Sequence, residues 1–150
     1  MRSWIIAGLL LAASAGAALA ADTAAIQFRP VVDCDTHPGA EHLSIYSPQA
    51  HCLGEPVVTE RDFVRLERLR LGGSPILRGE LTEEAQLRFY EFTVHHRFRP
   101  MALLVQGRPT EVWVVRGPSY PVWLLVSGGY LSDAEANQVA DKFYADGGRD

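Results

Sequence analysis

The chain alternates hydrophobic and polar residues in several short stretches, a pattern that predicts β-strands. Between Phe63 and Leu71 the alternation slips once, at Glu67–Arg68, as a β-bulge would produce. Further strands are expected over Ile26–Val32, Leu43–Tyr46, Ile76–Leu81, Met101–Gln106, Glu111–Val115 and Val122–Val126. Pro30 confines the first of these to a sheet edge or an irregular segment, because proline cannot donate to a ladder. The last is the most apolar and is expected to be central.

Two segments carry the period of an amphipathic helix. The first begins after Thr82, and its apolar face comprises Ala85, Phe89, Phe92 and His96. The second begins after Ser132, which forms a capping box with Glu135, and its apolar face comprises Ala136, Val139, Ala140 and Phe143. Shorter features are a helical turn capped by Thr59 and a hairpin turn over 107–109. These elements predict an α+β fold in which two helices pack on one face of a largely antiparallel sheet.

The first twenty residues have the pattern of a secretory signal peptide. Arg2 is followed by an uncharged apolar run, Trp4–Leu19, and small residues precede the expected cleavage point between Ala20 and Ala21. The run covers 16 residues, fewer than the roughly 20 that span a bilayer. The alternative is an uncleaved anchor. Cleavage would leave a periplasmic or secreted chain without a stable membrane anchor.

The charge balance argues against some classes of partner. The formal net charge is −4, and removal of the leader with Arg2 makes it −5. A chain this acidic, with Lys142 as its single lysine, is a poor candidate for nucleic acid or for anionic membrane surfaces. The 130 residues that follow the leader suffice for one domain.

Two cysteines, Cys34 and Cys52, are separated by 17 residues. In an oxidising compartment, an even count predicts a disulfide between them. The alternative is a metal site in the loop 33–52, where zinc or copper ligands are abundant. Its candidate ligands are Asp33, Cys34, Asp35, His37, Glu41, His42, His51 and Cys52. Since bonded sulfurs are not thiolate ligands and no standard zinc spacing occurs, we expect no metal and no other cofactor.

No sequence motif indicates an enzyme. The chain lacks a nucleophile elbow, a phosphate loop and a His-Glu-x-x-His motif. Adjacent His95 and His96 would point about 100° apart on a helix, so they cannot face one ligand. Trp113 and Tyr120 lie near turns, where they could form an exposed aromatic patch for a peptide.

Four segments in order resemble the head subdomain of the first periplasmic domain of SecD, the accessory subunit of the bacterial protein translocase. They are CLGEPVVTERDF (Cys52–Phe63), LRGELTEEAQLRFYEFT (Leu77–Thr93), MALLVQGRPTEVWVV (Met101–Val115) and LLVSGGYLSDAEANQVADKF (Leu124–Phe143). Two features depart from that pattern. Gln106 replaces the aspartate before the hairpin glycine, and the Ser-Ala-Pro that follows the hairpin is absent.

The resemblance implies a SecD-head-like domain that contacts unfolded or envelope proteins and is not an enzyme. It does not imply a translocase, because the membrane helices of SecD have no counterpart after cleavage. The expected organisation is a signal peptide at 1–20, a partly disordered extension at 21–42, the domain at 43–145 and a tail at 146–150. A protein- or peptide-binding role in the periplasm is therefore the main hypothesis, and metal binding by the loop 33–52 is the alternative.

Overall fold

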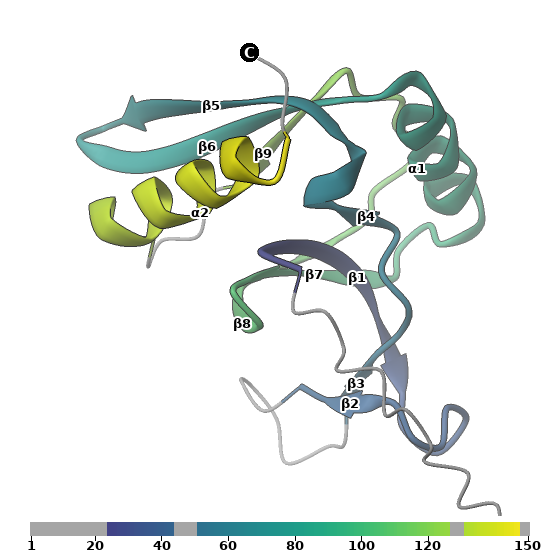
Figure 1. Ribbon diagram of the computed structural model, residues 1–150. Coiled ribbons are helices and arrows are strands. Elements are labelled where there is room, and N and C mark those ends of the chain that lie inside the picture. The colour runs from purple at the N-terminus through teal and green to yellow at the C-terminus, as the bar shows by residue number, and fades with distance from the viewer. Residues whose placement is uncertain (1–23, 44–50, 127–130, 148–150) are drawn as a thin grey trace, which may run out of the picture.

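A computed structural model describes residues 24–43, 51–126 and 131–147 of the chain. Its strands are β1 (Ile26–Asp33), β2 (Glu41–His42), β3 (His51–Leu53), β4 (Val58–Thr59), β5 (Phe63–Leu71), β6 (Ser74–Leu81), β7 (Pro100–Val105), β8 (Arg108–Val114) and β9 (Trp123–Val126). Its helices are the 3₁₀ turn η1 (Glu60–Asp62), α1 (Glu83–His95) and α2 (Asp133–Ala145). The pairings are antiparallel, and the predicted α+β class is confirmed (Figure 1). The predicted strand at Leu43–Tyr46 lies mostly outside the described residues.

The strands divide between two sheets, a feature that the sequence pattern did not predict. The larger sheet has the order β2-β3-β1-β7-β8, with β4 also paired to β1. The smaller sheet has the order β5-β6-β9. Both helices contact the smaller sheet, since α2 packs against β5 and β6 while α1 contacts β6.

Strand β1 lies inside the larger sheet, so the edge position predicted from Pro30 is wrong. β7 pairs along one side of it, and β4 and β3 pair along the other. Pro30 is tolerated because it lies where the partner of β1 changes from β4 to β3, and its carbonyl oxygen accepts a hydrogen bond from Gly54 N at 2.8 Å. Strand β1 therefore lies on the N-terminal side of residue 43, where the sequence predicts that the domain begins.

Two details of the smaller sheet also differ from prediction. β9 pairs only with β6 among the described strands, so this apolar strand is an edge strand rather than a central one. The irregularity in β5 lies between Phe63 and Arg65, not at Glu67–Arg68. At this point the ring of Phe63 packs against Gly79 of β6.

The hairpin that joins β7 to β8 turns on two residues. Gln106 and Gly107 both have positive φ, 51° and 74°, which is the geometry of the tight turns that match the twist of paired strands. The turn thus begins one residue before the predicted stretch 107–109, and Pro109 is part of β8, paired with Leu104.

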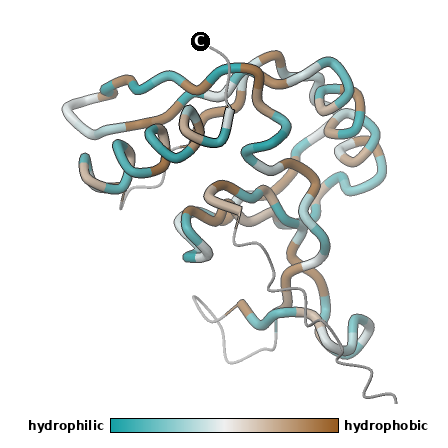
Figure 2. Tube along the Cα trace, in the orientation of Figure 1, coloured by the Kyte–Doolittle hydropathy of each residue, from teal (hydrophilic) through white to brown (hydrophobic). Residues whose placement is uncertain are grey.

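Both predicted helix starts are confirmed. The Thr82 hydroxyl accepts from Ala85 N, and Ser132 forms a capping box with Glu135. Along α2, hydrophilic and hydrophobic segments alternate, as expected for a helix with one buried face (Figure 2). Its buried residues are the four predicted ones, Ala136, Val139, Ala140 and Phe143.

One main core joins the two sheets and the two helices. It contains Phe28 of β1, Leu66 of β5, Phe89 of α1, Leu103 of β7 and Val139 of α2, each at most 5% exposed. A second, smaller cluster lies on the other face of the larger sheet and consists of Leu53, Ala102 and Leu104. The larger sheet is therefore buried on both faces at β7.

Candidate functional site

A cleft of about 920 Å³ lies at the junction of the two sheets. Buried side chains of β1 and α1, Phe28 and Phe89, contribute to its lining. More exposed side chains of the two edge strands also line it, among them Val114 of β8 and Leu125 of β9, which are 49% and 51% exposed. Large apolar side chains at this level of exposure are available to a ligand.

Trp113 is one wall of this cleft. Along β8 the side chains alternate, so Trp113 is half-buried while Val112 and Val114 are exposed. The indole packs edge-on against Phe28, with ring centroids 5.9 Å apart and an interplanar angle of 78°. Since its position is set by core packing, Trp113 offers a ligand a preformed apolar surface.

Tyr120 does not line the cleft. It is 51% exposed, and its ring lies edge-on to Tyr90 of α1 at 6.0 Å. Ser119 N donates to the Thr93 hydroxyl at 2.9 Å, which fixes this segment to α1. Of the two aromatic residues predicted to contact a peptide, Trp113 therefore lines this cleft and Tyr120 does not.

The two strands beside the cleft have open edges. In the described part of the chain, β8 pairs only with β7, and β9 pairs only with β6. An open edge presents backbone N–H and C=O groups without ladder partners, which can pair with another extended chain. Apolar side chains and free backbone groups therefore occur together at this cleft.

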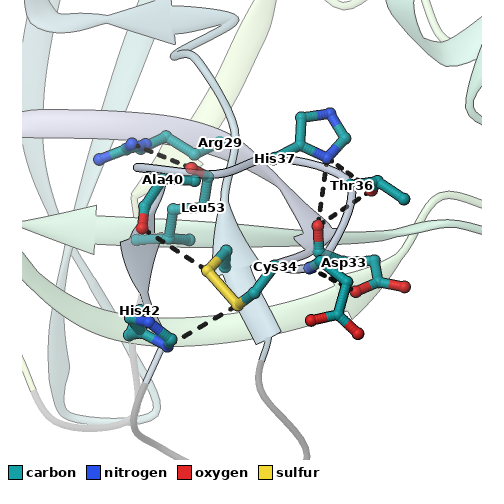
Figure 3. The surroundings of a disulfide bond; sticks show 10 residues. Arg29, Asp33, Cys34, Thr36, His37, Ala40, His42 and Leu53 are labelled. Carbon is teal, nitrogen blue, oxygen red and sulfur yellow. Dashed lines mark hydrogen bonds between the residues drawn. A yellow bond between two sulfur atoms is a disulfide. The ribbon is translucent and has the colours of Figure 1, made fainter.

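The disulfide predicted between Cys34 and Cys52 is present, with the Cα atoms 5.1 Å apart. It links the end of β1 to β3, and His42 lies beside it, with Nδ1 3.7 Å from Cys34 Sγ. Figure 3 shows His37 and His42 pointing to opposite sides of the disulfide. Nδ1 of His37 instead lies 2.9 Å from the Thr36 hydroxyl.

The geometry of this loop limits the metal alternative. Within the described ranges, Cys34, His42 and Cys52 offer ligand atoms within 4.8 Å of one another. The two sulfurs are bonded to each other, however, and cannot act as thiolate ligands in this state. When the two sulfurs are excluded as metal ligands, His42 is the one potential ligand left in that group.

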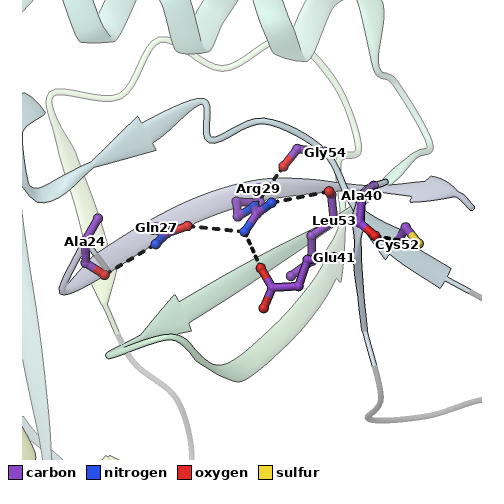
Figure 4. Close-up of polar contacts among 8 residues, drawn as sticks. All are labelled: Ala24, Gln27, Arg29, Ala40, Glu41, Cys52, Leu53 and Gly54. Atoms are coloured by element: carbon purple, nitrogen blue, oxygen red, sulfur yellow. Dashed lines mark hydrogen bonds and ion pairs between the residues drawn. The ribbon is translucent and has the colours of Figure 1, made fainter. Parts of the chain in front are cut away.

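Arg29 fixes the position of the disulfide loop relative to the larger sheet (Figure 4). Its Nε donates to Gly54 O at 2.7 Å, and its Nη2 donates to Leu53 O at 3.3 Å. Its Nη1 reaches the Glu41 carboxylate at 2.8 Å. Because these bonds engage all three guanidinium nitrogens with the protein itself, we assign Arg29 a structural role rather than a binding role.

The cleavage point between Ala20 and Ala21 lies outside the described residues, and cleavage there stays a prediction. Within the described ranges, no helix has the length and apolar character needed to cross a membrane.

Comparison with known proteins identifies the fold. No family model matches the sequence, and no curated protein matches it. A structure of SecDF, described as a membrane component that enhances protein export, superimposes with a TM-score of 0.60 at 20% identity over 81% of this chain. A second SecDF structure, in a super-membrane-facing form, gives the same values. This chain spans 62% of the length of the first and 18% of the second. At this identity the likeness establishes a shared fold, and the predicted SecD-like architecture is confirmed.

Sequence reasoning found Trp113 but missed the other walls of the cleft. The sequence pattern predicts Phe28 and Phe89 as ordinary core residues and Leu125 as part of a buried strand. The signal that could have found them is the pairing of β8 and β9 into different sheets, which is not visible in local sequence patterns.

Proposed function

We propose that this chain is an exported, non-enzymatic domain that binds extended segments of unfolded polypeptide in the cleft between β8 and β9. The observation that carries the proposal is an apolar cleft flanked by two open strand edges. An extended peptide can add to such an edge through its backbone while alternate side chains enter apolar surface. The likeness to SecDF, a component described as enhancing protein export, supports a substrate of this kind.

The lining of the cleft suits a ligand of variable sequence. Glu111 and Arg116 are its charged lining residues, and the remainder is apolar or small. Backbone hydrogen bonds do not depend on side-chain identity, so strand addition tolerates many sequences. A domain that meets unfolded chains in the periplasm needs this tolerance.

Fluorescence anisotropy with a labelled peptide of alternating valine and threonine tests the proposal. Leu125→Glu places a charge on the cleft wall and is expected to weaken binding about tenfold, because a carboxylate opposes apolar burial there. Leu87→Glu is the matched control, since Leu87 is also 51% exposed but lies on α1 outside the cleft.

A second peptide distinguishes strand addition from simple apolar contact. Methylating alternate backbone nitrogens removes donors without adding charge, and we expect this peptide to bind more weakly by about tenfold. Equal affinity of Leu125→Glu and wild-type protein for the first peptide would overturn the proposal.

A further inference from the structure

A local cluster of unpaired cations lies at the end of α1, although the whole protein is acidic. Arg97, Arg99 and Arg116 make no salt bridge with any carboxylate in the part of the chain that the structure describes. Arginines elsewhere, such as Arg70 and Arg108, are paired with Asp133 and Glu135. The net charge of −4 therefore conceals a positive surface.

Phe98 stands in the middle of this cluster. Its side chain is 66% exposed, and its φ of 62° lies in the left-handed region, which is unusual for a bulky residue. Two backbone hydrogen bonds hold it in place: Phe98 N donates to Val115 O at 2.6 Å, and Val115 N donates to Arg99 O at 2.9 Å. The same pairing brings Arg116 to the tip. The fold thus presents the ring to solvent at a fixed position.

Contacts around the ring keep charge and apolar surface together. The Arg97 guanidinium lies over the Phe98 ring, 4.7 Å from its centroid. This cation–π contact leaves the outer part of the guanidinium free for an anion. We call Arg97, Phe98, Arg99 and Arg116 the basic tip.

An exposed apolar stripe runs along α1 toward the basic tip. Leu87, Tyr90 and Val94 are spaced by three and four residues, so they share one face of the helix, and they are 51%, 40% and 40% exposed. Tyr120 adds its ring beside Tyr90. α1 thus carries apolar side chains on a face that does not belong to the core. Figure 1 places this helix at one end of the molecule.

We propose that the basic tip and the α1 stripe form a docking surface for a membrane that contains anionic phospholipid. Arginines or lysines together with exposed Phe, Trp or Leu side chains are typical of surfaces that bind at the membrane interface. Phe98 would enter the headgroup region, while the three guanidinium groups pair with lipid phosphates. This role is separate from peptide binding in the cleft, to which Arg116 contributes a lining residue and Phe98 does not.

Charge and shape favour a lipid surface over a nucleic acid. Three cations beside one exposed ring form a small cluster, whereas nucleic acid binding rewards a longer basic stripe. At physiological salt, charges act over about 8 Å, so the cluster can meet anionic lipid despite the acidic surface elsewhere. The exposed stripe would contribute nothing to binding phosphates alone.

Co-sedimentation with vesicles tests the proposal, using protein purified from cells that express the full chain. We expect binding to vesicles of phosphatidylcholine with about one third phosphatidylglycerol, and much weaker binding to phosphatidylcholine alone. Replacing all three arginines (Arg97→Gln, Arg99→Gln, Arg116→Gln) should weaken binding about a hundredfold, at about fivefold for each arginine.

Phe98→Asn tests the apolar contribution, because asparagine tolerates the left-handed backbone and keeps the fold. It should weaken vesicle binding about tenfold. Leu71→Asn is the matched control: Leu71 is 67% exposed at the β5–β6 hairpin, at the other end of the molecule in Figure 1, and its neighbour Arg70 is paired with Asp133.

Three results would overturn the proposal. The first is equal binding of the wild-type protein to both kinds of vesicle, and the second is unchanged vesicle binding by the triple variant. The third is that the wild-type protein binds an oligonucleotide or an acidic peptide, and that the triple variant loses this binding but still binds vesicles. Peptide affinity in the cleft is measured in parallel with Phe98→Asn and should not change, so failure of lipid docking is distinguishable from failure of the proposed function.

Discussion

Gly79 lies in β6 directly against the ring of Phe63, which is 5% exposed. A Cβ atom at position 79 would lie 2.5 Å from Phe63 Cε1, closer than two carbon atoms can approach. The glycine therefore permits the ring to fill the core at the point where the register of β5 shifts.

We predict that Gly79→Ala lowers the free energy of unfolding by about 1–3 kcal/mol, because the ring must leave its packed position. Urea denaturation followed by circular dichroism measures the change. Gly117→Ala serves as the control, since nothing lies within 4 Å of an added Cβ there. Equal stability of the two variants would show that the sheet adapts to the methyl group.

At the scale of elements, the start of α2 depends on one carboxylate that serves two partners. Ser132 N and Ser132 Oγ both lie 2.9 Å from Glu135 Oε2, and Arg108 of β8 pairs with the other oxygen. The hydrogen bond from the Ser132 backbone is the main cause that holds the pKa of Glu135 below its ordinary value, with smaller contributions from the Ser132 hydroxyl and Arg108. Glu135 thus caps α2 and ties it to the larger sheet.

The lowered pKa makes this contribution dependent on pH. A carboxyl group whose pKa is depressed by folding stabilises the protein above its unfolded pKa, and the stabilisation is lost as the pH falls through the folded pKa. We predict that Glu135→Ala costs about 1 kcal/mol at neutral pH and much less near about pH 3. The group is partly exposed, so salt reduces the effect further.

Thermal unfolding of the wild-type protein and of Glu135→Ala, from neutral pH down to about pH 3, measures the difference in stability between them. Glu91→Ala is the control, because Glu91 lies on α1 and its side chain has no hydrogen bond or salt bridge within the described residues. A difference between wild-type protein and Glu135→Ala that stays constant down to acidic pH would contradict a role for the ionised carboxylate.

The accuracy of the sequence predictions follows from how local each signal is. The caps at Thr82 and Ser132 are set by residues within three positions, and both helices begin where predicted. The β7–β8 turn was misplaced because Gln106, an ordinary side chain, adopts the positive φ that sequence rules reserve for glycine or asparagine. The edge position predicted for the first strand was wrong for a similar reason. The effect of the missing N–H of Pro30 depends on strand pairings that the sequence does not show.

At the scale of the whole molecule, the arrangement of strands could not be read from the chain. The sequence predicted strand existence well, but sheet membership depends on pairings between distant segments, such as β1 with β7 and β6 with β9. The cleft exists because β8 and β9 end different sheets. The sequence therefore predicted these residues as parts of strands and helices but, apart from Trp113, not as parts of a binding site.

The position of β1 gives a prediction about the extent of the domain. Ile26 and Phe28 are at most 2% exposed, and β7 has β1 as its partner on the side away from β8. Loss of one buried large side chain costs about 2–5 kcal/mol, against a total stability of about 5–15 kcal/mol. A chain that begins at Leu43 should therefore fail to fold, whereas a chain that begins at Ala24 should fold.

Urea unfolding monitored by circular dichroism distinguishes the two chains. The chain that begins at Leu43 also loses Cys34, so the variant Cys34→Ser/Cys52→Ser of the chain that begins at Ala24 separates the effect of the strand from that of the disulfide. We expect this variant to unfold cooperatively at lower urea, because the disulfide closes a loop with a sequence separation of 18 and contributes about 3 kcal/mol. Cooperative unfolding of the chain that begins at Leu43 would mean that residues 24–42 are an extension of the domain, as the sequence suggested, and that β7 can end the sheet by itself.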